Sequence, residues 1–80
     1  MDKSQIKRDE NVDYQMLEAY SITLQWHQPW QVSLFHPDID GKFVWYPERG
    51  TLMRETEHGT YKIGEYTDTE EVINEIQKFL

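Results

Sequence analysis

The feature that most constrains the fold is a series of short alternating apolar and polar runs between residues 21 and 66. In the first run, Ile22, Leu24 and Trp26 alternate with polar neighbours, which is typical of a half-buried β-strand. Later runs are separated by segments rich in Pro, Asp and Gly, the residues that favour chain reversal. The pattern predicts four or five antiparallel strands joined in meander order.

The end of the chain has the period of an amphipathic helix instead. Thr67 or Asp68 has the spacing of a helix cap, and acidic residues fill the first turn, where the helix dipole favours them. The large apolar residues of this segment share one face: Val72, Ile73, Ile76, Phe79 and Leu80. We therefore predict an α+β fold, in which one C-terminal amphipathic helix packs on one face of a four- to five-stranded antiparallel meander sheet.

Eighty residues provide material for one domain. Residues 1–12 are mostly charged and polar, so we interpret them as a mobile polar arm, and residues 13–80 as a single α+β domain. Residues 13–20 have the composition of one or two helical turns, with Tyr14 and Leu17 turned inward. One C-terminal helix covers only one face of the sheet, so this segment is one candidate to cover the other.

The amino-acid composition bears on the cellular location of the protein. It has no cysteine, which excludes a disulfide framework and a thiolate metal site. No apolar run approaches the ~18 residues that span a bilayer, and the first residues are too polar for a signal peptide. The sequence predicts a soluble, cytoplasmic protein that does not enter a membrane.

The formal net charge of −7 bears on the choice of partner. Acidic proteins are poor ligands for phosphate backbones, because that binding depends on Lys and Arg. The charge instead permits a basic protein partner, or a role in which carboxylates imitate nucleic acid. A second interpretation, that the charge only keeps a small protein soluble, stays open.

Aromatic residues provide the first candidates for a binding surface. The predicted strands carry apolar residues on both faces, more than one helix shelters, so some rings are expected to meet solvent, residues 13–20 or another protein chain. The candidate partner-binding aromatics are Trp26, Phe35, Phe43 and Trp45. Partner binding or formation of a homodimer would use these side chains.

Acidic residues provide the second set of candidates. Spaced carboxylates on a small rigid scaffold are able to occupy a basic groove that normally holds DNA or RNA. The candidates, which the sequence places in turns, at a strand end and at the start of the helix, are Glu48, Glu55, Glu57, Glu70 and Glu71. The alternative is that these acids are scattered over the surface without a common role.

No catalytic, metal or cofactor motif stands out in the sequence. There is no nucleophile elbow and no phosphate-binding glycine loop. A calcium loop that starts at Asp38 would need Gly and Glu where Phe43 and Arg49 stand. We therefore expect a protein that is not an enzyme and that needs neither a metal nor a cofactor.

A different function, binding of single-stranded nucleic acid, would use aromatic side chains as a stacking platform. The rings available to it are Trp26, Trp30, Trp45, Tyr46 and Tyr61. Residues 21–66 hold four basic residues against six acids, so the basic groove that normally accompanies such a platform is missing. A protein that only associates with itself is a third interpretation.

The stretch from Phe43 to Leu52 contains the pattern Tyr46-Pro47-x-x-Gly50-Thr51. It resembles a hairpin found in small uncharacterised accessory proteins of bacteriophages and mobile elements. The resemblance covers about ten residues and implies a context, that of short acidic proteins that bind and block a host protein. The sequence thus predicts a small acidic protein-binding module, and inhibition of a host nucleic-acid-handling protein is its sharper form.

Overall fold

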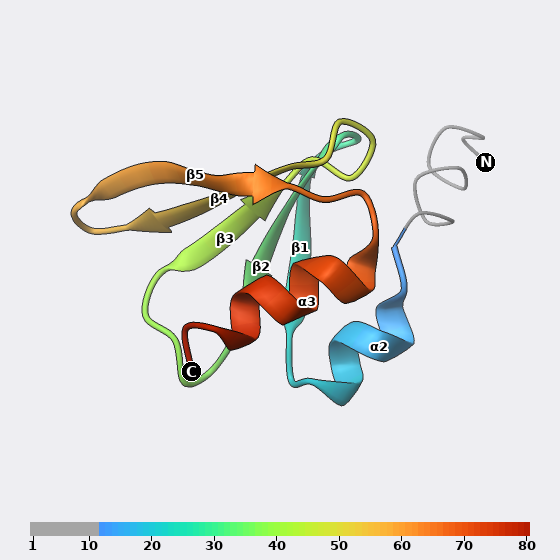
Figure 1. Ribbon diagram of the computed structural model, residues 1–80, viewed down its shortest axis with the longest axis horizontal. Coiled ribbons are helices and arrows are strands. Elements are labelled where there is room, and N and C mark those ends of the chain that lie inside the picture. The colour runs from blue at the N-terminus through green and yellow to red at the C-terminus, as the bar shows by residue number, and fades with distance from the viewer. Residues whose placement is uncertain (1–11) are drawn as a thin grey trace.

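The structure, a computed structural model, describes residues 12–80 and contains two helices and one sheet (Figure 1). The elements, in chain order, are α2 (Tyr14–Ala19), β1 (Thr23–Gln28), β2 (Gln31–Phe35), β3 (Lys42–Trp45), β4 (Thr51–Thr56), β5 (Gly59–Glu65) and α3 (Thr69–Gln77). All neighbouring strands pair antiparallel in the order β1-β2-β3-β4-β5. The predicted α+β fold, with its meander sheet and C-terminal helix, is confirmed.

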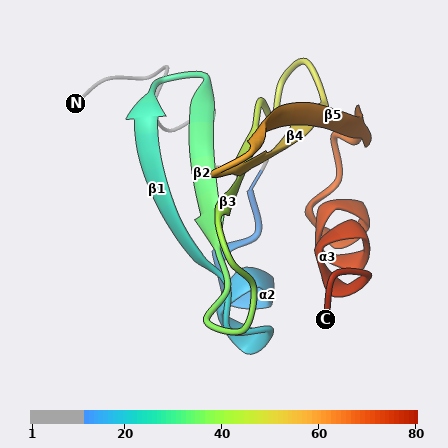
Figure 2. The same cartoon turned by 90° about the vertical axis from the view of Figure 1, so that its left-hand side faces the viewer.

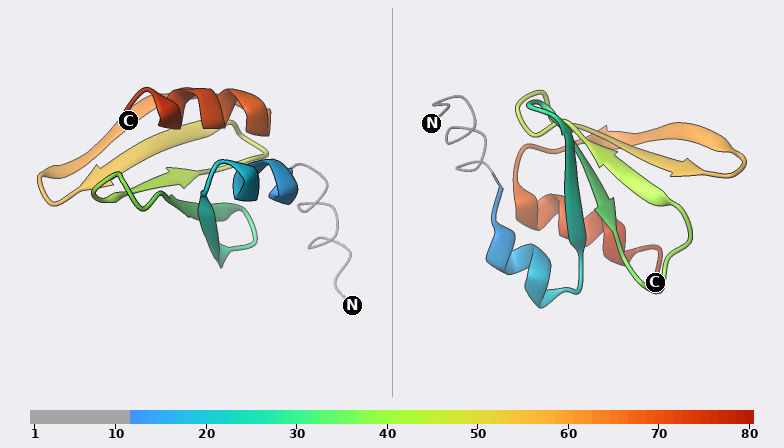
Figure 3. Two further views of the ribbon diagram at one scale, coloured as in Figure 1. Left: turned by 90° about the horizontal axis from the view of Figure 1, so that it is seen from below. Right: turned by 180° about the vertical axis from the view of Figure 1, so that it is seen from behind.

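Both helices lie on the same side of the sheet. Figure 2 shows the sheet bending around them, with α2 beneath β1 and β2 and α3 beneath β4 and β5. The view from below in Figure 3 shows the same arrangement, and the two helices contact one another. The interpretation that residues 13–20 cover the second face of the sheet is therefore wrong, because α2 packs beside α3 on the first.

The core lies between the inner face of the sheet and the helices. Cross-strand pairs join Val32 to Trp45 and Trp45 to Leu52, and all three side chains are fully buried. The helices contribute Leu17 from α2, and Val72, Ile73 and Ile76 from α3. Burial of each large apolar side chain contributes about 1.5–3 kcal/mol. These buried side chains of the sheet and helices therefore provide the main stabilisation of the fold.

A glycine turn connects the sheet to the start of α3. Gly50 has a φ of +92°, a left-handed conformation that favours glycine. Its carbonyl oxygen accepts a hydrogen bond from the backbone N–H of Tyr66, at 2.6 Å. The carbonyl of Tyr66 in turn accepts from Trp45 Nε1 at 2.7 Å, so the buried indole is satisfied. These bonds hold the β3–β4 turn against the segment that leads into α3.

The start of the domain differs from the sequence prediction by one residue. Val12 was assigned to the polar arm, yet its side chain is only 4 % exposed and belongs to the core. The reason is that α2 packs on α3, which draws the residue before the cap of α2 into the apolar layer. The rest of the predicted arm, residues 1–11, lies outside the described residues.

The end of the chain corrects the predicted apolar face of the helix. Helix α3 ends at Gln77, and Leu80 beyond it is 63 % exposed, so Leu80 does not belong to the buried face. Phe79 is 38 % exposed and meets the buried ring of Phe43 edge to face, with ring centroids 5.3 Å apart. The guanidinium of Arg54 lies 4.5 Å from the centroid of the Phe79 ring. The last turn thus closes the core through Phe79.

The outer face of the sheet has no helix over it among residues 12–80. Ser33 and Val44 are nevertheless buried there, next to each other in the register of β2 and β3. His27 Nε2 lies 2.5 Å from Ser33 Oγ, which satisfies the buried hydroxyl.

Candidate partner-binding surface

The starts of the two helices are held side by side by hydrogen bonds. Asp13 caps α2, because its Oδ1 accepts from the backbone N–H of Met16 at 3.0 Å. Asp68 caps α3 in the same way, accepting from the N–H of Glu70 at 3.2 Å. The backbone N–H of Asp13 also donates to Thr69 Oγ1 at 3.0 Å. Two capping carboxylates therefore lie at one end of the molecule.

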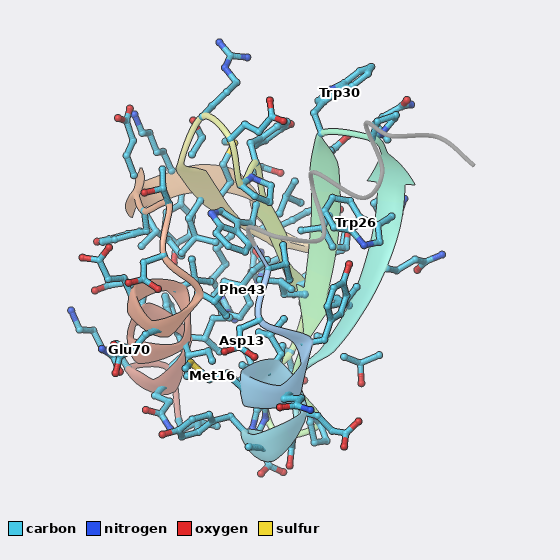
Figure 4. The ribbon with its side chains drawn as sticks, turned by 90° about the vertical axis from the view of Figure 1, so that its right-hand side faces the viewer. Asp13, Met16, Trp26, Trp30, Phe43 and Glu70 are labelled. Carbon is cyan, nitrogen blue, oxygen red and sulfur yellow. The ribbon has the colours of Figure 1, made fainter. Side chains whose placement is uncertain are left out.

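An open groove lies between these helix starts. It is lined by residues 12–16 of the first helical segment and by residues 67–69 before α3. Figure 4 shows Asp13 in the middle of this end of the molecule, with Glu70 of α3 on one side and Trp26 of β1 on the other. The groove itself is lined by Asp13, Tyr14 and Asp68, with Glu70 beyond its α3 side and Trp26 beyond its β1 side. We call the α3 side the acidic wall and the β1 side the aromatic wall.

The aromatic wall consists of side chains from α2, β1 and the turn after β1. Trp26 is half-buried on the inner face of the sheet, and its Nε1 donates to the hydroxyl of Tyr14 at 3.0 Å. Tyr14 is 39 % exposed, and Trp30, in the β1–β2 turn, is 53 % exposed. Since α2 has only six residues, it leaves the part of β1 near this turn uncovered. Exposed Trp and Tyr side chains are enriched in protein interfaces.

The acidic wall carries charge that no described residue neutralises. We call the whole surface the end face; it consists of Asp13, Tyr14, Trp26, Trp30, Asp68, Glu70 and Glu71. Its four carboxylates form no ion pair within residues 12–80. Within residues 12–80, the end face therefore combines four unpaired carboxylates with exposed rings.

The three lysines of residues 12–80 form ion pairs away from the end face. Lys62 pairs with Glu65 at 2.7 Å and Lys78 with Glu75 at 2.8 Å. Hydrogen bonding to Glu75 and its charge raise the pKa of Lys78, and the same interactions with Lys62 lower the pKa of Glu65. A third pair joins Lys42 and Glu55 across β3 and β4.

The sequence-predicted aromatic site is not assembled. Phe43 and Trp45 are 1 % and 0 % exposed, so neither belongs to an exposed patch, which corrects the prediction. The physical reason is register: Phe43 and Trp45 share the inner face of β3, opposite Leu34 and Val32. Phe35 is half-buried at the end of β2, on the outer face. Only Trp26 among the four predicted rings lies on the end face.

The predicted acids are divided between two ends of the molecule. Glu70 and Glu71 stand in the first turn of α3, on the end face. Glu55 and Glu57 lie at the end of β4 and in the β4–β5 turn, at the far tip of that hairpin (Figure 1). Glu48 is exposed in the β3–β4 turn. The five carboxylates therefore do not form one continuous row.

Sequence reasoning missed other members of the end face. Tyr14 was expected to turn inward and Trp30 to begin a strand, but β2 starts at Gln31 and Trp30 lies in the turn. A large ring directly after Gln28-Pro29, where a strand cannot continue its ladder, was the available signal. The proximity of Asp13 and Asp68 depends on α2 packing against α3, which no local pattern encodes.

A histidine and a serine of the sheet lie within hydrogen-bond distance of each other, as a catalytic base and hydroxyl would. The His27–Ser33 contact joins a base to a hydroxyl, but Ser33 is fully buried, so its oxygen has no access to a substrate. No group of three or more His, Cys, Asp or Glu residues that would hold a metal occurs in residues 12–80. We therefore consider the end face as a binding surface.

None of the protein-family models, curated proteins or solved structures compared with this chain matches it. Within residues 12–80, no helix is long and apolar enough to cross a membrane. The resemblance of the Tyr46-Pro47 hairpin to bacteriophage accessory proteins stays a prediction.

Proposed function

We propose that this protein is a binding module for a Lys- or Arg-bearing segment of a partner protein, and that the end face holds that segment. Two features of this surface support the proposal. Asp13, Asp68 and Tyr14 line one open groove, and further carboxylates and exposed rings lie beyond it. The carboxylates form no ion pair within residues 12–80. Different residues of the segment would contact the two walls: one Lys or Arg would make charge-assisted hydrogen bonds to Glu70 or Asp68, and another would make a cation–π contact with Trp30, which lies at the other end of this surface (Figure 4).

The alternative of single-stranded nucleic-acid binding finds less support in the geometry. Trp45, one of the rings proposed for stacking, is fully buried. Lys42 and Lys62 pair with glutamates, which reduces the positive charge available for phosphates. A protein partner fits the charge of the surface better.

A sharper form of the proposal is that the basic segment belongs to a nucleic-acid-handling protein, which this module would inhibit by occupying its groove. Its support is limited to the charge of the end face, because Glu55 and Glu57 lie at the other end of the molecule. Competition separates the two forms: a DNA oligonucleotide should displace this protein from such a partner, and from a partner without a nucleic-acid site it should not.

The proposal is tested with a labelled peptide of alternating Lys and Gly as probe, by fluorescence anisotropy at low and high salt. We expect binding that weakens as salt rises, because exposed charges are screened. The double variant Glu70→Gln, Glu71→Gln should weaken binding by about tenfold, if each lost charge pair contributes about 0.7 kcal/mol.

The matched control removes two carboxylates away from the end face, with Asp38→Asn and Glu57→Gln. The two double variants change the net charge by the same amount. An effect of net charge alone would therefore weaken peptide binding equally in both. Equal weakening, or absence of binding at low salt, would contradict the proposal. Trp30→Ala should also weaken binding, whereas removal of the exposed ring Tyr61 on β5 should not.

A further inference from the structure

Strand β1 forms an open edge of the sheet. It pairs with β2 on one side only, and no other strand in residues 12–80 lies along its second side. The outward backbone groups of Thr23–Gln28 have no hydrogen-bond partner within that part of the chain. Such an edge is a template for pairing with another strand.

The side chains of β1 do not protect this edge. None of its six residues is Asp, Glu, Lys or Arg, and its register with β2 is regular from Thr23 to Trp26, before a shift between Trp26 and Gln28 at the end of the strand. The opposite edge, β5, carries Lys62 and Glu65, and its pairing with β4 is interrupted by a bulge next to Gly64. Charges and bulges are the usual devices that prevent edge pairing. Both edge strands have an irregular register, but only β5 carries charged side chains, so the regular part of β1, Thr23 to Trp26, is the less protected edge.

We infer that the β1 edge pairs with the β1 edge of a second copy of this chain. This inference rests on the strand edge and not on the partner-binding proposal, although Trp26 belongs to both surfaces. Two copies with a net charge of −7 repel one another over most of their surfaces. Repulsion is weakest where β1 meets β1, because this strand contains no Asp or Glu. A two-fold axis gives an antiparallel, self-complementary pair.

The side chains of β1 favour one alignment of this strand with β1 of the second copy. If Gln25 lies opposite Gln25 of the copy, then Leu24 of each chain lies opposite Trp26 of the other on the inner face. One continuous sheet then runs through both copies, and the two end faces lie on the same side of it.

The contact is small, so the dimer is weak and depends on concentration. Salt screens the repulsion between the acidic copies, so high salt should favour association, whereas it weakens binding of a basic peptide. Sedimentation equilibrium over a range of concentrations at low and high NaCl measures this. A chain that stays monomeric at every concentration and salt would overturn the inference.

Two variants locate the contact. Gln25→Glu places two carboxylates opposite one another and should weaken the dimer by about threefold or more. Thr60→Glu adds the same charge to an exposed position of β5. Because this charge lies away from β1, the dimer affinity should stay within a factor of two of that of the unaltered protein. Equal weakening by both variants would show that β1 is not the contact.

Hydrogen exchange of the unaltered protein provides a test that needs no variant. The outward amides of β1 should exchange fast in dilute solution and become protected as the dimer forms. Protection in a monomer at every concentration would mean that the edge is covered within one chain. That result would overturn the inference as well.

Discussion

Replacement of Phe79 tests whether the turn after α3 closes the core. Phe79→Ala removes a ring that is more than half buried, worth about 1–2 kcal/mol. It also removes the edge-to-face contact with Phe43, worth about 0.5–1.5 kcal/mol, and the contact with Arg54, worth about 0.5–1 kcal/mol. Part of the lost free energy is regained, because the end of the chain rearranges easily around the missing ring. We expect the free energy of unfolding to fall by about 2 kcal/mol.

Urea unfolding followed by Trp fluorescence and circular dichroism measures this change, and the melting temperature should fall by roughly 8–16 °C for a domain of this size. Leu80→Ala is the matched control, because Leu80 is the next residue and is 63 % exposed. It should change the free energy by less than about 0.5 kcal/mol. Equal stability of the Phe79 variant and the unaltered protein would refute the reasoning.

Three further predictions concern the connections of α3 and a surface pair. Asp68→Ala should lower the free energy of unfolding by about 1 kcal/mol in thermal melts, and Asp68→Asn by much less, because asparagine also caps helices. Gly50→Ala should lower it by about 1 kcal/mol or more, since a Cβ there would lie 3.2 Å from Thr67 Cγ2 at a φ of +92°. In an NMR titration, Glu65 should protonate at lower pH than an unpaired glutamate, because Lys62 lowers its pKa. The pair's contribution to stability is therefore present at neutral pH and lost as pH falls through that pKa, and Lys62→Gln should remove the difference.

The sequence predicted the sheet well because local patterns determine it. Alternation of Leu24 and Trp26 with polar residues marks β1, and the glycines at 41, 50 and 59 mark three of the reversals, each with a positive φ. The cap and apolar face of α3 follow from the same kind of local spacing. Strand order in a meander then follows from short connections.

Side-chain burial was less predictable, because β3 is apolar on both faces and its alternation does not show which face meets the helices. The register with β2 and β4 decides this, and it buries Trp45 while Val44 faces outward. The position of α2 is a second non-local outcome. The hydrogen bond from Asp13 to Thr69 spans most of the chain, so the end face has no local signature.

The three tryptophan indole N–H groups report whether the end face holds a basic segment. Trp26 and Trp30 lie on that surface, whereas Trp45 is fully buried and donates to Tyr66, which makes it an internal reference. In a two-dimensional ¹H–¹⁵N NMR titration with the Lys-Gly peptide, we predict that the indole signals of Trp26 and Trp30 shift with saturation while that of Trp45 stays in place. Unchanged signals for Trp26 and Trp30 at peptide concentrations that saturate binding would contradict the account.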